Sequence, residues 1–328
     1  MSQAVEVTVV ICVYNAEGYI EETLQSLADQ TFQSFKILLI DDCSTDSSFE
    51  VAESFLNAKG RLFKSVRLNE NRGTAYVRNL ALHEVDTPLM MFFDADDVAL
   101  PTLVQRLYER IQEDADLIAV GSHCSYMDEY SKPLSGGIFL GPKTRTEFEE
   151  RSKNGKMLFM LPPSLFRREY AIAAGGYVQE GFPEGGRRYQ DLSEDVDLWT
   201  RMTDCYQENL YMVVVPEPLF RYRKNCSSLS GSKESLFAMQ YKLKYIKNNL
   251  LRRRSGRAQL TFIEFINSLR RGERIKMWFK NYSAYFYRMA GFAYVRKNYV
   301  LFFWGLFLSV LLNPFYLIDK FKHNILRK

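Results

Sequence analysis

The acidic segment Asp94-Ala95-Asp96 has the residue types and the spacing that could hold a metal ion. It directly follows an apolar run at 89–93 that reads as a buried strand. Two carboxylates two residues apart at a strand end can reach one Mg²⁺ or Mn²⁺, with phosphate oxygens completing its coordination. Such an ion would neutralise a diphosphate leaving group. Solvated loop acids are the alternative, and we expect Asp97 to be only a helix-start residue.

Two more polar clusters follow predicted strands. Asp41 and Asp42 end the apolar run 35–40, where a carboxylate could accept the imide N–H of a uracil or a ribose hydroxyl. The turn at 69–73 leads into a helix that carries Arg78. A helix N-terminus with a nearby arginine favours an anionic ligand, and surface salt bridging is the alternative.

Apolar runs alternate with amphipathic segments through the first part of the chain. We expect strands at 5–15, 35–40, 63–68, 89–93 and 117–122, and helices at 17–30, 44–56, 74–83 and after Pro101. This alternation predicts an α/β fold with a doubly wound, mostly parallel sheet. Ligands bind such sheets outside the carboxyl ends of the strands. Tyr14-Asn15, Asp41-Asp42 and residues 94–97 should therefore converge on one edge.

The pattern is less regular beyond residue 123. We expect a loop or hairpin at 132–142, partly helical segments at 156–170 and 192–203, and a strand at 211–215. Pro216 and Pro218 should stop this strand, because proline cannot donate a ladder hydrogen bond. From Lys233 onward the sequence predicts helices only.

Four segments, in this order and spacing, resemble glycosyltransferase family 2: VVICVYN, DDCSTD, NRGTAYVRN and FFDADD. The resemblance covers roughly residues 5–230 and implies the GT-A fold, a nucleotide-sugar donor and inversion at the anomeric carbon. It implies that Asp41 and Asp42 flank the uracil and ribose, and that Arg78 lies near the nucleotide. It also implies that Asp94 and Asp96 form the metal and diphosphate motif. The donor-binding residues that follow are Val13, Tyr14, Asn15, Asp41, Asp42, Arg78, Asp94, Ala95 and Asp96.

The same resemblance directs attention to the segment EDVDLW that begins at Glu194. In the family an ED pair near this position supplies the general base, which we match to Asp195. Glu194 would orient the acceptor, and Trp199 would also lie on the acceptor side. A single displacement needs one carboxylate that deprotonates the attacking hydroxyl. The alternative is the polar start of an amphipathic helix with Trp199 buried.

Two positions depart from the family pattern. Cys12 stands where the family usually has proline, at a strand end. Asn225 stands two residues after Arg223, where a histidine often follows. This weakens the case for a third protein ligand to the metal. Arg223 or Lys224 could instead bind the diphosphate as a point charge.

Composition limits the class of protein. The chain has 328 residues, 47% hydrophobic and 25% charged, which indicates a packed core and excludes disorder, collagen and low complexity. Its five cysteines form no CxxC pair and its three histidines are scattered. A disulfide scaffold or a Cys-based zinc site is therefore not expected, and a metal would need oxygen ligands. The first residues lack the features of a signal peptide, so we expect the bulk of the chain in the cytoplasm.

Charge divides the chain into two parts. Residues 233–328 hold 20 Lys and Arg against 4 Asp and Glu, whereas residues 1–232 hold 23 against 35. The basic part interleaves aromatic residues, which suits nucleic acid or an anionic membrane surface. The uncharged run at 299–318 favours the membrane, since its 20 residues approach the length of a span. A full span, an in-plane or re-entrant helix kinked at Pro314, and a buried core helix remain open.

The leading prediction is a metal-dependent, inverting glycosyltransferase at the cytoplasmic face of the bacterial inner membrane. It would move a sugar from a UDP-sugar to a glycan or lipid-linked acceptor, as in polysaccharide or lipopolysaccharide synthesis, without nucleic acid. The expected domains are 1–232 (catalytic), 233–298 (basic, helical) and 299–328 (membrane-associating). The alternatives are a nucleotidyltransferase, which lacks its Gly-rich, Lys-bearing loop here, and an inactive membrane scaffold. The oligomeric state is open, a homo-oligomer included.

Overall fold

The computed structural model describes residues 5–316 apart from 186, 225–232 and 296. The chain forms two compact units, which we describe separately. Unit 1 comprises Met1–Cys226 and Ile246–Gln259, and unit 2 comprises Ser227–Tyr245 and Leu260–Lys328. The expected domain boundary after residue 232 lies outside the described residues.

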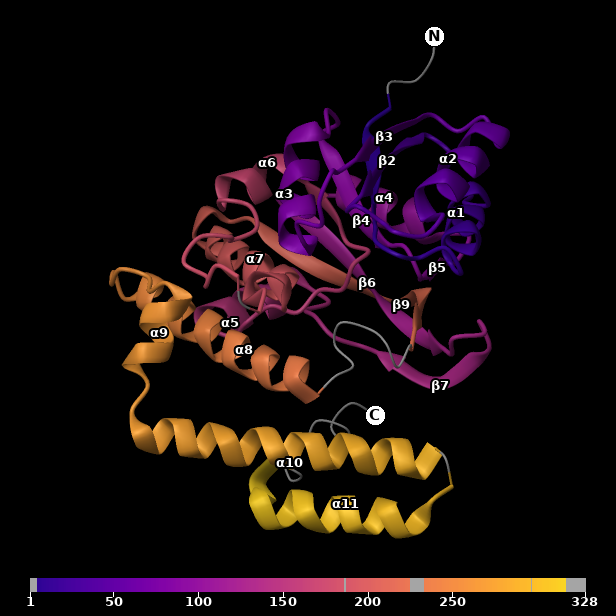
Figure 1. The fold of residues 1–328 in the computed structure, drawn as a ribbon. Coiled ribbons are helices and arrows are strands. Elements are labelled where there is room, and N and C mark those ends of the chain that lie inside the picture. Colours follow the sequence, from indigo (N-terminus) through magenta and orange to yellow (C-terminus); the bar gives the residue numbers. More distant parts are fainter. Residues whose placement is uncertain (1–4, 186, 225–232, 296, 317–328) are drawn as a thin grey trace. The chain divides into compact units, whose positions relative to one another are not determined.

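Unit 1 is built on a mixed sheet whose strands run in the order β3-β2-β1-β4-β8-β6-β9-β5, with β7 paired to β6 (Figure 1). The strands are β1 Val7–Val13, β2 Phe35–Asp41, β3 Phe63–Arg67, β4 Leu89–Asp94, β5 Val98–Ala99, β6 Leu117–Met127, β7 Pro133–Ile138, β8 Leu165–Arg167 and β9 Tyr211–Arg223. Strands β3, β2, β1 and β4 are parallel, as are β6 and β9, whereas β8 joins β4 to β6 in the antiparallel sense. The predicted α/β sheet is confirmed.

Helices flank this sheet in unit 1 (Figure 1). They are α1 Ile20–Ala28, α2 Ser48–Ala58, α3 Thr74–Glu84, α4 Leu103–Gln112, α5 Arg145–Lys153, α6 Arg168–Ala173 and α7 Glu194–Met202, with short 3₁₀ helices η1 Tyr189–Asp191 and η2 Thr203–Glu208. In α1 the apolar residues Ile20, Leu24 and Leu27 are fully buried. Positions three and four apart lie on one helix face, which explains this burial.

One prediction about the second half of unit 1 was wrong, and another holds only over a few residues. The strand expected to stop at Pro216 continues as β9 to Arg223. It does so because its pairing with β6 shifts register after Ser122, where Val215 is the last partner before Pro218, and both prolines are exposed. Such bulges accommodate residues that cannot join the ladder. Of the segment expected to be partly helical at 156–170, only the last three residues are helical, and β8 precedes them.

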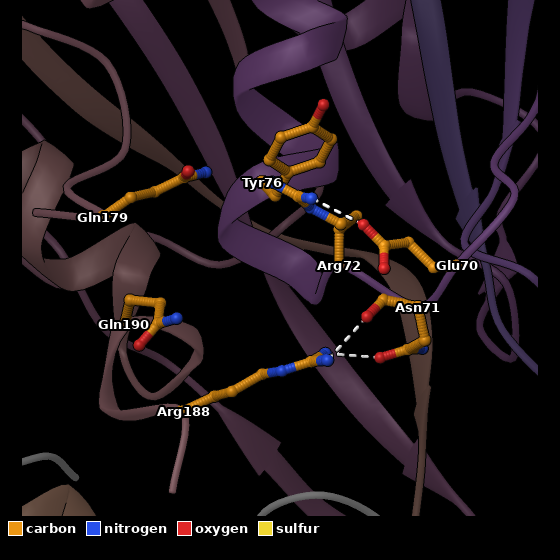
Figure 2. A pocket seen from close by; sticks show the side chains of 7 residues that line it. All are labelled: Glu70, Asn71, Arg72, Tyr76, Gln179, Arg188 and Gln190. Atoms are coloured by element: carbon orange, nitrogen blue, oxygen red, sulfur yellow. Dashed lines mark hydrogen bonds and ion pairs between the residues drawn. The ribbon is translucent and has the colours of Figure 1, made fainter. Parts of the chain in front are cut away.

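The turn that leads into α3 is held from two directions. Asp42, just after β2, accepts the backbone N–H groups of Arg72 at 2.6 Å and Gly73 at 2.8 Å. On its other side Arg188 donates to the side chain and carbonyl oxygens of Asn71 (Figure 2). Gly73 has φ 88°, and a Cβ there would lie 2.2 Å from the carboxylate of Asp191. Glycine is therefore required at the start of α3.

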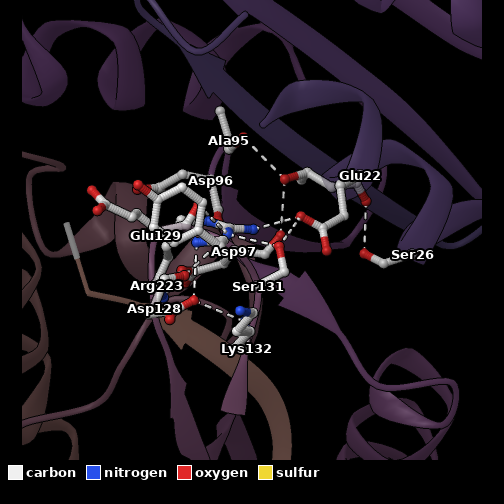
Figure 3. Close-up of polar contacts among 12 residues, drawn as sticks. Glu22, Ser26, Ala95, Asp96, Asp97, Asp128, Glu129, Ser131, Lys132 and Arg223 are labelled. Carbon is white, nitrogen blue, oxygen red and sulfur yellow. Dashed lines mark hydrogen bonds and ion pairs between the residues drawn. The ribbon is translucent and has the colours of Figure 1, made fainter. Parts of the chain in front are cut away.

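The loop after β4 is held by Arg223, the last residue of β9 (Figure 3). The backbone N–H of Arg223 donates to Asp97 Oδ1 at 2.9 Å, and its Nε donates to the carbonyl oxygen of Asp96 at 2.6 Å. The same guanidinium pairs with Glu22 of α1 at 2.7 Å and donates to Ser131 Oγ at 2.9 Å. Arg223 thus joins the acidic loop to α1 and to the β6–β7 connection.

These contacts correct two expectations. The side chain of Arg223 is fully buried and bound to protein groups, so it does not offer its charge to a diphosphate. Asp97 is not a helix-start residue, because α4 begins only at Leu103 and Asp97 is buried as an anchor for Arg223.

Unit 2 is helical over its described residues. It contains the first part of α8 Lys233–Arg254, then α9 Phe262–Ser268, α10 Arg271–Val295 and α11 Tyr299–Leu312. Helices α10 and α11 lie side by side as a hairpin (Figure 1). Ser283 and Ser309 are buried between them and bond to each other at 3.0 Å, and a Cβ at Gly305 would lie 3.0 Å from the carbonyl of Phe286. Small residues thus allow close packing of the two helices.

The apolar run at 299–318 forms α11 only as far as Leu312, and its last two residues lie outside the described range. Among the described helices, none combines the length and the apolar character that crossing a membrane would require.

Replacing Arg223 with leucine should destabilise unit 1 strongly. The change leaves the carbonyl of Asp96 and the hydroxyl of Ser131 without their donor, and each polar group left unpaired in the interior costs about 1–3 kcal/mol. Arg106→Leu is the control, since its pair with Glu217 is half exposed and should contribute at most about 1 kcal/mol. Urea unfolding of both variants measures the difference. Equal losses would contradict the role of Arg223 as a clamp.

Candidate active site

The ends of β1, β2 and β4 lie side by side. Val13 pairs with Asp41, and Cys12 pairs with Asp94, so the polar residues that follow these strands meet at one edge of the sheet. This is the convergence that the strand order predicts. Burial raises the pKa of the Cys12 thiol to about 12, so Cys12 is a neutral part of the floor.

Tyr14 and Asn15 form one rim of this edge. Tyr14 is 51% exposed at this edge. Asn15 has a positive φ of 49°, and its side chain accepts the backbone N–H of Thr45 at 2.8 Å. Asn15 therefore ties the end of β1 to the loop after β2, and its backbone N–H donates to Ser44 Oγ at 3.0 Å.

Asp41 and Asp42 have different roles, although the sequence analysis assigned both to the uracil and ribose. Both oxygens of Asp42 accept backbone N–H groups of the turn before α3. Asp41 is fully buried, and its Oδ2 accepts the N–H of Ser44 at 3.1 Å. Its Oδ1 has no hydrogen-bond partner. Asp41 also pairs with Arg67 at 3.3 Å through Oδ2, so it is the acid of this pair that keeps one oxygen without a protein partner.

The acidic loop after β4 concentrates negative charge. Burial, followed by the charge of Asp94, raises the pKa of Asp96 to about 6. The backbone between them is fixed by Thr23, whose hydroxyl donates to the carbonyl of Ala95 at 3.0 Å. Burial raises the pKa of Asp94 as well, against the opposing charge of Arg78. Negative charge at this loop is therefore under-compensated, which is the electrostatic condition that a divalent cation relieves.

Within the described ranges, no group of three or more His, Cys, Asp or Glu side chains could hold a metal by itself. The donor set at this loop is therefore the two carboxylates of Asp94 and Asp96. Hard cations such as Mg²⁺ bind through one or two carboxylates together with substrate phosphates. The residues present fit Mg²⁺ or Mn²⁺ held jointly with a diphosphate.

Arg78 connects this loop to the ED pair. Its guanidinium lies 2.9 Å from Glu194 and 3.3 Å from Asp94, and its side chain is only 6% exposed. The aromatic rings of Phe92 and Tyr177 flank it at 5.1 and 5.9 Å. Arg78 therefore neutralises one carboxylate on the expected donor side and one on the expected acceptor side.

Glu194 and Asp195 open α7, directly after Ser193 in a left-handed conformation. Burial raises the pKa of Glu194 to about 8 against the opposing charge of Arg78. Burial also raises the pKa of Asp195, again opposed by Arg78. A raised pKa makes a carboxylate a stronger proton acceptor, which suits a general base.

Asp195 lines a small cavity of about 10 Å³ together with Arg78, Ser164, Tyr177 and Trp199. This volume matches about one water molecule. Trp199 is 3% exposed and packs edge-on against Phe166 at 5.4 Å, so it forms part of the core wall behind Asp195. Its indole Nε1 has no hydrogen-bond partner.

The sequence did not reveal two residues that shape this site. Asp191 accepts the N–H of Ala75 at 2.9 Å and so joins the start of α3 to the approach to α7. Asn79 donates to the carbonyl of Tyr177 at 2.5 Å and accepts its N–H at 2.7 Å. Asp191 and Asn79 each bind a residue that is distant in the chain, so the sequence does not reveal these contacts. The one signal in the sequence is the position of Asp191 shortly before the ED pair.

Comparisons with known proteins agree with this geometry. The family model described as "Glycosyl transferase family 2" matches residues 8–174. A teichoic acid poly(glycerol phosphate) polymerase of Staphylococcus epidermidis is 35% identical over 114 residues, which are 35% of this chain but only 16% of that protein. Among solved structures, Staphylococcus aureus TarS with UDP-GlcNAc has a TM-score of 0.53 at 16% identity, covering 92% of this chain and 90% of that one.

A mannosyltransferase of Pyrobaculum calidifontis, solved with GDP-Man and Mn²⁺, has a TM-score of 0.51 at 14% identity, covering 97% of this chain and 89% of that one. At these identities the solved structures show the GT-A fold alone. The family model, in contrast, spans more than half of the chain. The chain therefore belongs to glycosyltransferase family 2.

Proposed function

We propose that this glycosyltransferase moves a sugar from a UDP-sugar to a hydroxyl of a glycan or lipid-linked acceptor in cell-surface polysaccharide synthesis, with inversion at the anomeric carbon. The observation that carries the proposal is the Arg78 bridge between Asp94 and Glu194. It brings the candidate metal and diphosphate motif beside the candidate base.

Features of both sides support this proposal. The unpartnered Oδ1 of Asp41 and the exposed ring of Tyr14 suit a uridine. Structural neighbours carry UDP-GlcNAc or GDP-Man, which supports a nucleotide-sugar donor. The name of the Staphylococcus epidermidis relative supports an acceptor in a cell-wall polymer.

In the proposed reaction Asp195 takes the proton of the acceptor hydroxyl, whose oxygen attacks the anomeric carbon. The bond from that carbon to the diphosphate breaks on the opposite face, so the configuration inverts. Asp94 and Asp96 would hold Mg²⁺ or Mn²⁺, which when bound stabilises the charge that develops on the diphosphate. Arg78 keeps Glu194 and Asp94 in place during the step.

We also propose that the α10–α11 hairpin binds the surface of the cytoplasmic membrane from its cytoplasmic face. Exposed apolar side chains on α11 include Val300 at 81%, Phe303 at 66% and Leu311 at 67%. The start of α10 adds a cluster of cations, namely Arg271, Arg274, Lys276 and Lys280. Apolar surface beside cationic charge complements an anionic bilayer better than a second copy of the same basic hairpin.

Asp96→Asn should remove most turnover and leave the fold intact, because the side chain holds charge rather than core. The loss should be about 10²–10⁴-fold, as expected when several kcal/mol of charge stabilisation disappear. Hydrolysis of UDP-sugars with Mn²⁺ measures turnover, and Mn²⁺ affinity measured by electron paramagnetic resonance gives an independent readout. Asp86→Asn, an exposed partner of Lys36, is the control. Undiminished wild-type turnover in EDTA would contradict the metal role.

Asp195→Asn keeps the shape of the side chain and removes its basicity, so transfer should fall about 10²–10⁴-fold. The wild-type rate should rise with pH through the raised pKa of the buried carboxyl, above the ordinary value of about 4. The residual rate of the variant should no longer rise with pH over this range, whereas its affinity for UDP should be unchanged. If UDP affinity collapses together with turnover, Asp195 belongs to the donor site instead.

Full-length protein should float with vesicles that contain phosphatidylglycerol, and the emission of Trp304 should shift to the blue. Phe303→Asp combined with Phe307→Asp should reduce flotation about tenfold or more, because each charge opposes insertion of α11. Leu62→Asp changes an equally exposed apolar residue of unit 1 and should have no effect. A protein that stays unbound, or that covers α11 by dimerising in light scattering, would refute the membrane proposal.

A further inference from the structure

Two adjoining cavities of about 320 and 790 Å³ lie between the turn before α3 and the segment that leads to α7. Figure 2 shows the residues that line the smaller one. They share Arg72, Gln179, Arg188 and Gln190 as lining residues. None of the residues assigned to the donor at the strand ends lines either cavity. The turn itself separates them from β2, since its backbone binds Asp42. These cavities therefore adjoin the strand-end edge that suits the nucleotide, without sharing a lining residue with it.

The two arginines of the cavities differ in how far their charge is neutralised. Arg72 pairs with Glu70 at 2.6 Å, and its guanidinium lies over the ring of Tyr76 at 4.4 Å. Arg188 donates only to the neutral oxygens of Asn71, and among the described residues no carboxylate lies within ion-pair distance of it. Arg188 is therefore a cation, itself exposed, that is available to an anion.

Two amide groups of the lining have unmet hydrogen-bonding capacity. Gln179 Nε2 and Gln190 Oε1 are buried and have no partner. An unmade hydrogen bond of a buried polar atom costs about 1–3 kcal/mol, so a ligand that pairs both atoms is favoured. One atom is a donor and the other an acceptor, so a ligand that carries an acceptor group beside a donor group, such as an oxyanion next to a hydroxyl, would satisfy both.

The residues that line the outer part of the larger cavity indicate how this ligand would be oriented. It is lined by Phe182 and Pro183 together with the carboxylates of Glu180 and Glu184. These carboxylates repel an anion and can accept hydrogen bonds from hydroxyl groups. The ring of Phe182 is suited to pack against the C–H face of a sugar. The anion must therefore lie at Arg188 and Gln179, with neutral, hydroxyl-rich groups extending outward.

We propose that these cavities bind an anionic repeat unit of the acceptor glycan, with a phosphodiester or carboxylate oxyanion on Arg188 and Gln179 and a neighbouring hydroxyl on Gln190. The inference rests on the proposed transferase function and names the acceptor class. Gln190 stands five residues before Asp195, and the intervening Asp191 anchors this segment to α3. A unit held here would be remote from the attacking hydroxyl and would set how the chain of the acceptor approaches the base.

The test compares Arg188→Gln with Arg187→Gln. Arg187 is the exposed neighbour in the sequence and lines neither cavity, so the pair of variants is matched in charge and in segment. The probes are sn-glycerol 3-phosphate and glucuronate, titrated by NMR into full-length protein saturated with UDP and Mn²⁺. Preference for one probe distinguishes a phosphodiester from a carboxylate.

At least one probe should bind wild type and Arg187→Gln alike, and Arg188→Gln about tenfold more weakly, the loss expected for a charge-assisted hydrogen-bonded pair. Gln179→Leu should weaken the same probe. Equal binding by all variants, or binding of neither probe, would overturn the inference. It would also fail if the probes bind only without UDP, because the cavities would then belong to the nucleotide site.

Donor hydrolysis by the same samples separates this inference from the proposed function. An acceptor site is supported if wild type and Arg188→Gln both hydrolyse the donor while Arg188→Gln has lost probe binding. Hydrolysis without probe binding refutes the inference alone. If no UDP-sugar, GDP-sugar or TDP-sugar is hydrolysed while Arg188-dependent binding persists, the transferase proposal fails and the oxyanion site remains.

Discussion

A buried arginine is the constraint on which the candidate active site depends. The guanidinium of Arg78 cannot lose its proton at any ordinary pH, so its burial requires carboxylates around it. Asp94 and Glu194 meet that need from two segments that lie 100 residues apart in the chain. The rings of Phe92 and Tyr177 exclude water from its flanks. The position of the ED pair, which holds the candidate base, relative to the acidic loop is therefore set by charge neutralisation rather than by the sheet.

The approach to α7 is positioned by the same kind of contact. Asp191 reaches the start of α3, where Gly73 leaves room for its carboxylate, and Asn79 one helical turn further holds the backbone of Tyr177. Helix α3 thus carries contacts to the strand-end edge on one side and to the segments before α7 on the other. A change in the approach to α7 would be felt at Arg78, because both attach to this one helix.

Most of the sheet was predictable, because apolar runs of strand length alternate with helical stripes, and parallel strands place their carboxyl ends together. The different roles of residues of the same type could not be predicted from the sequence. Asp41 and Asp42 are adjacent acids, yet only the fold shows that one caps a turn and the other keeps a free oxygen. The sequence suggested Arg223 as a cation for the diphosphate, but in the fold it is buried and bound to Asp97, 126 positions away. Proline signals failed in β9, since a bulge tolerates them.

The two buried arginines that flank the acidic loop explain why its acids differ. Arg78 faces the carboxylate of Asp94, whereas Arg223 binds the loop through the carbonyl of Asp96 and through a backbone N–H to Asp97. The loop backbone is thereby held without a direct ion pair to the side chain of Asp96. That carboxylate keeps an unfavourable, partly buried charge, visible as its raised pKa. A protein that used the loop only for structure would gain by neutralising Asp96. Retaining its charge beside a rigid backbone is the arrangement expected where an external cation must bind.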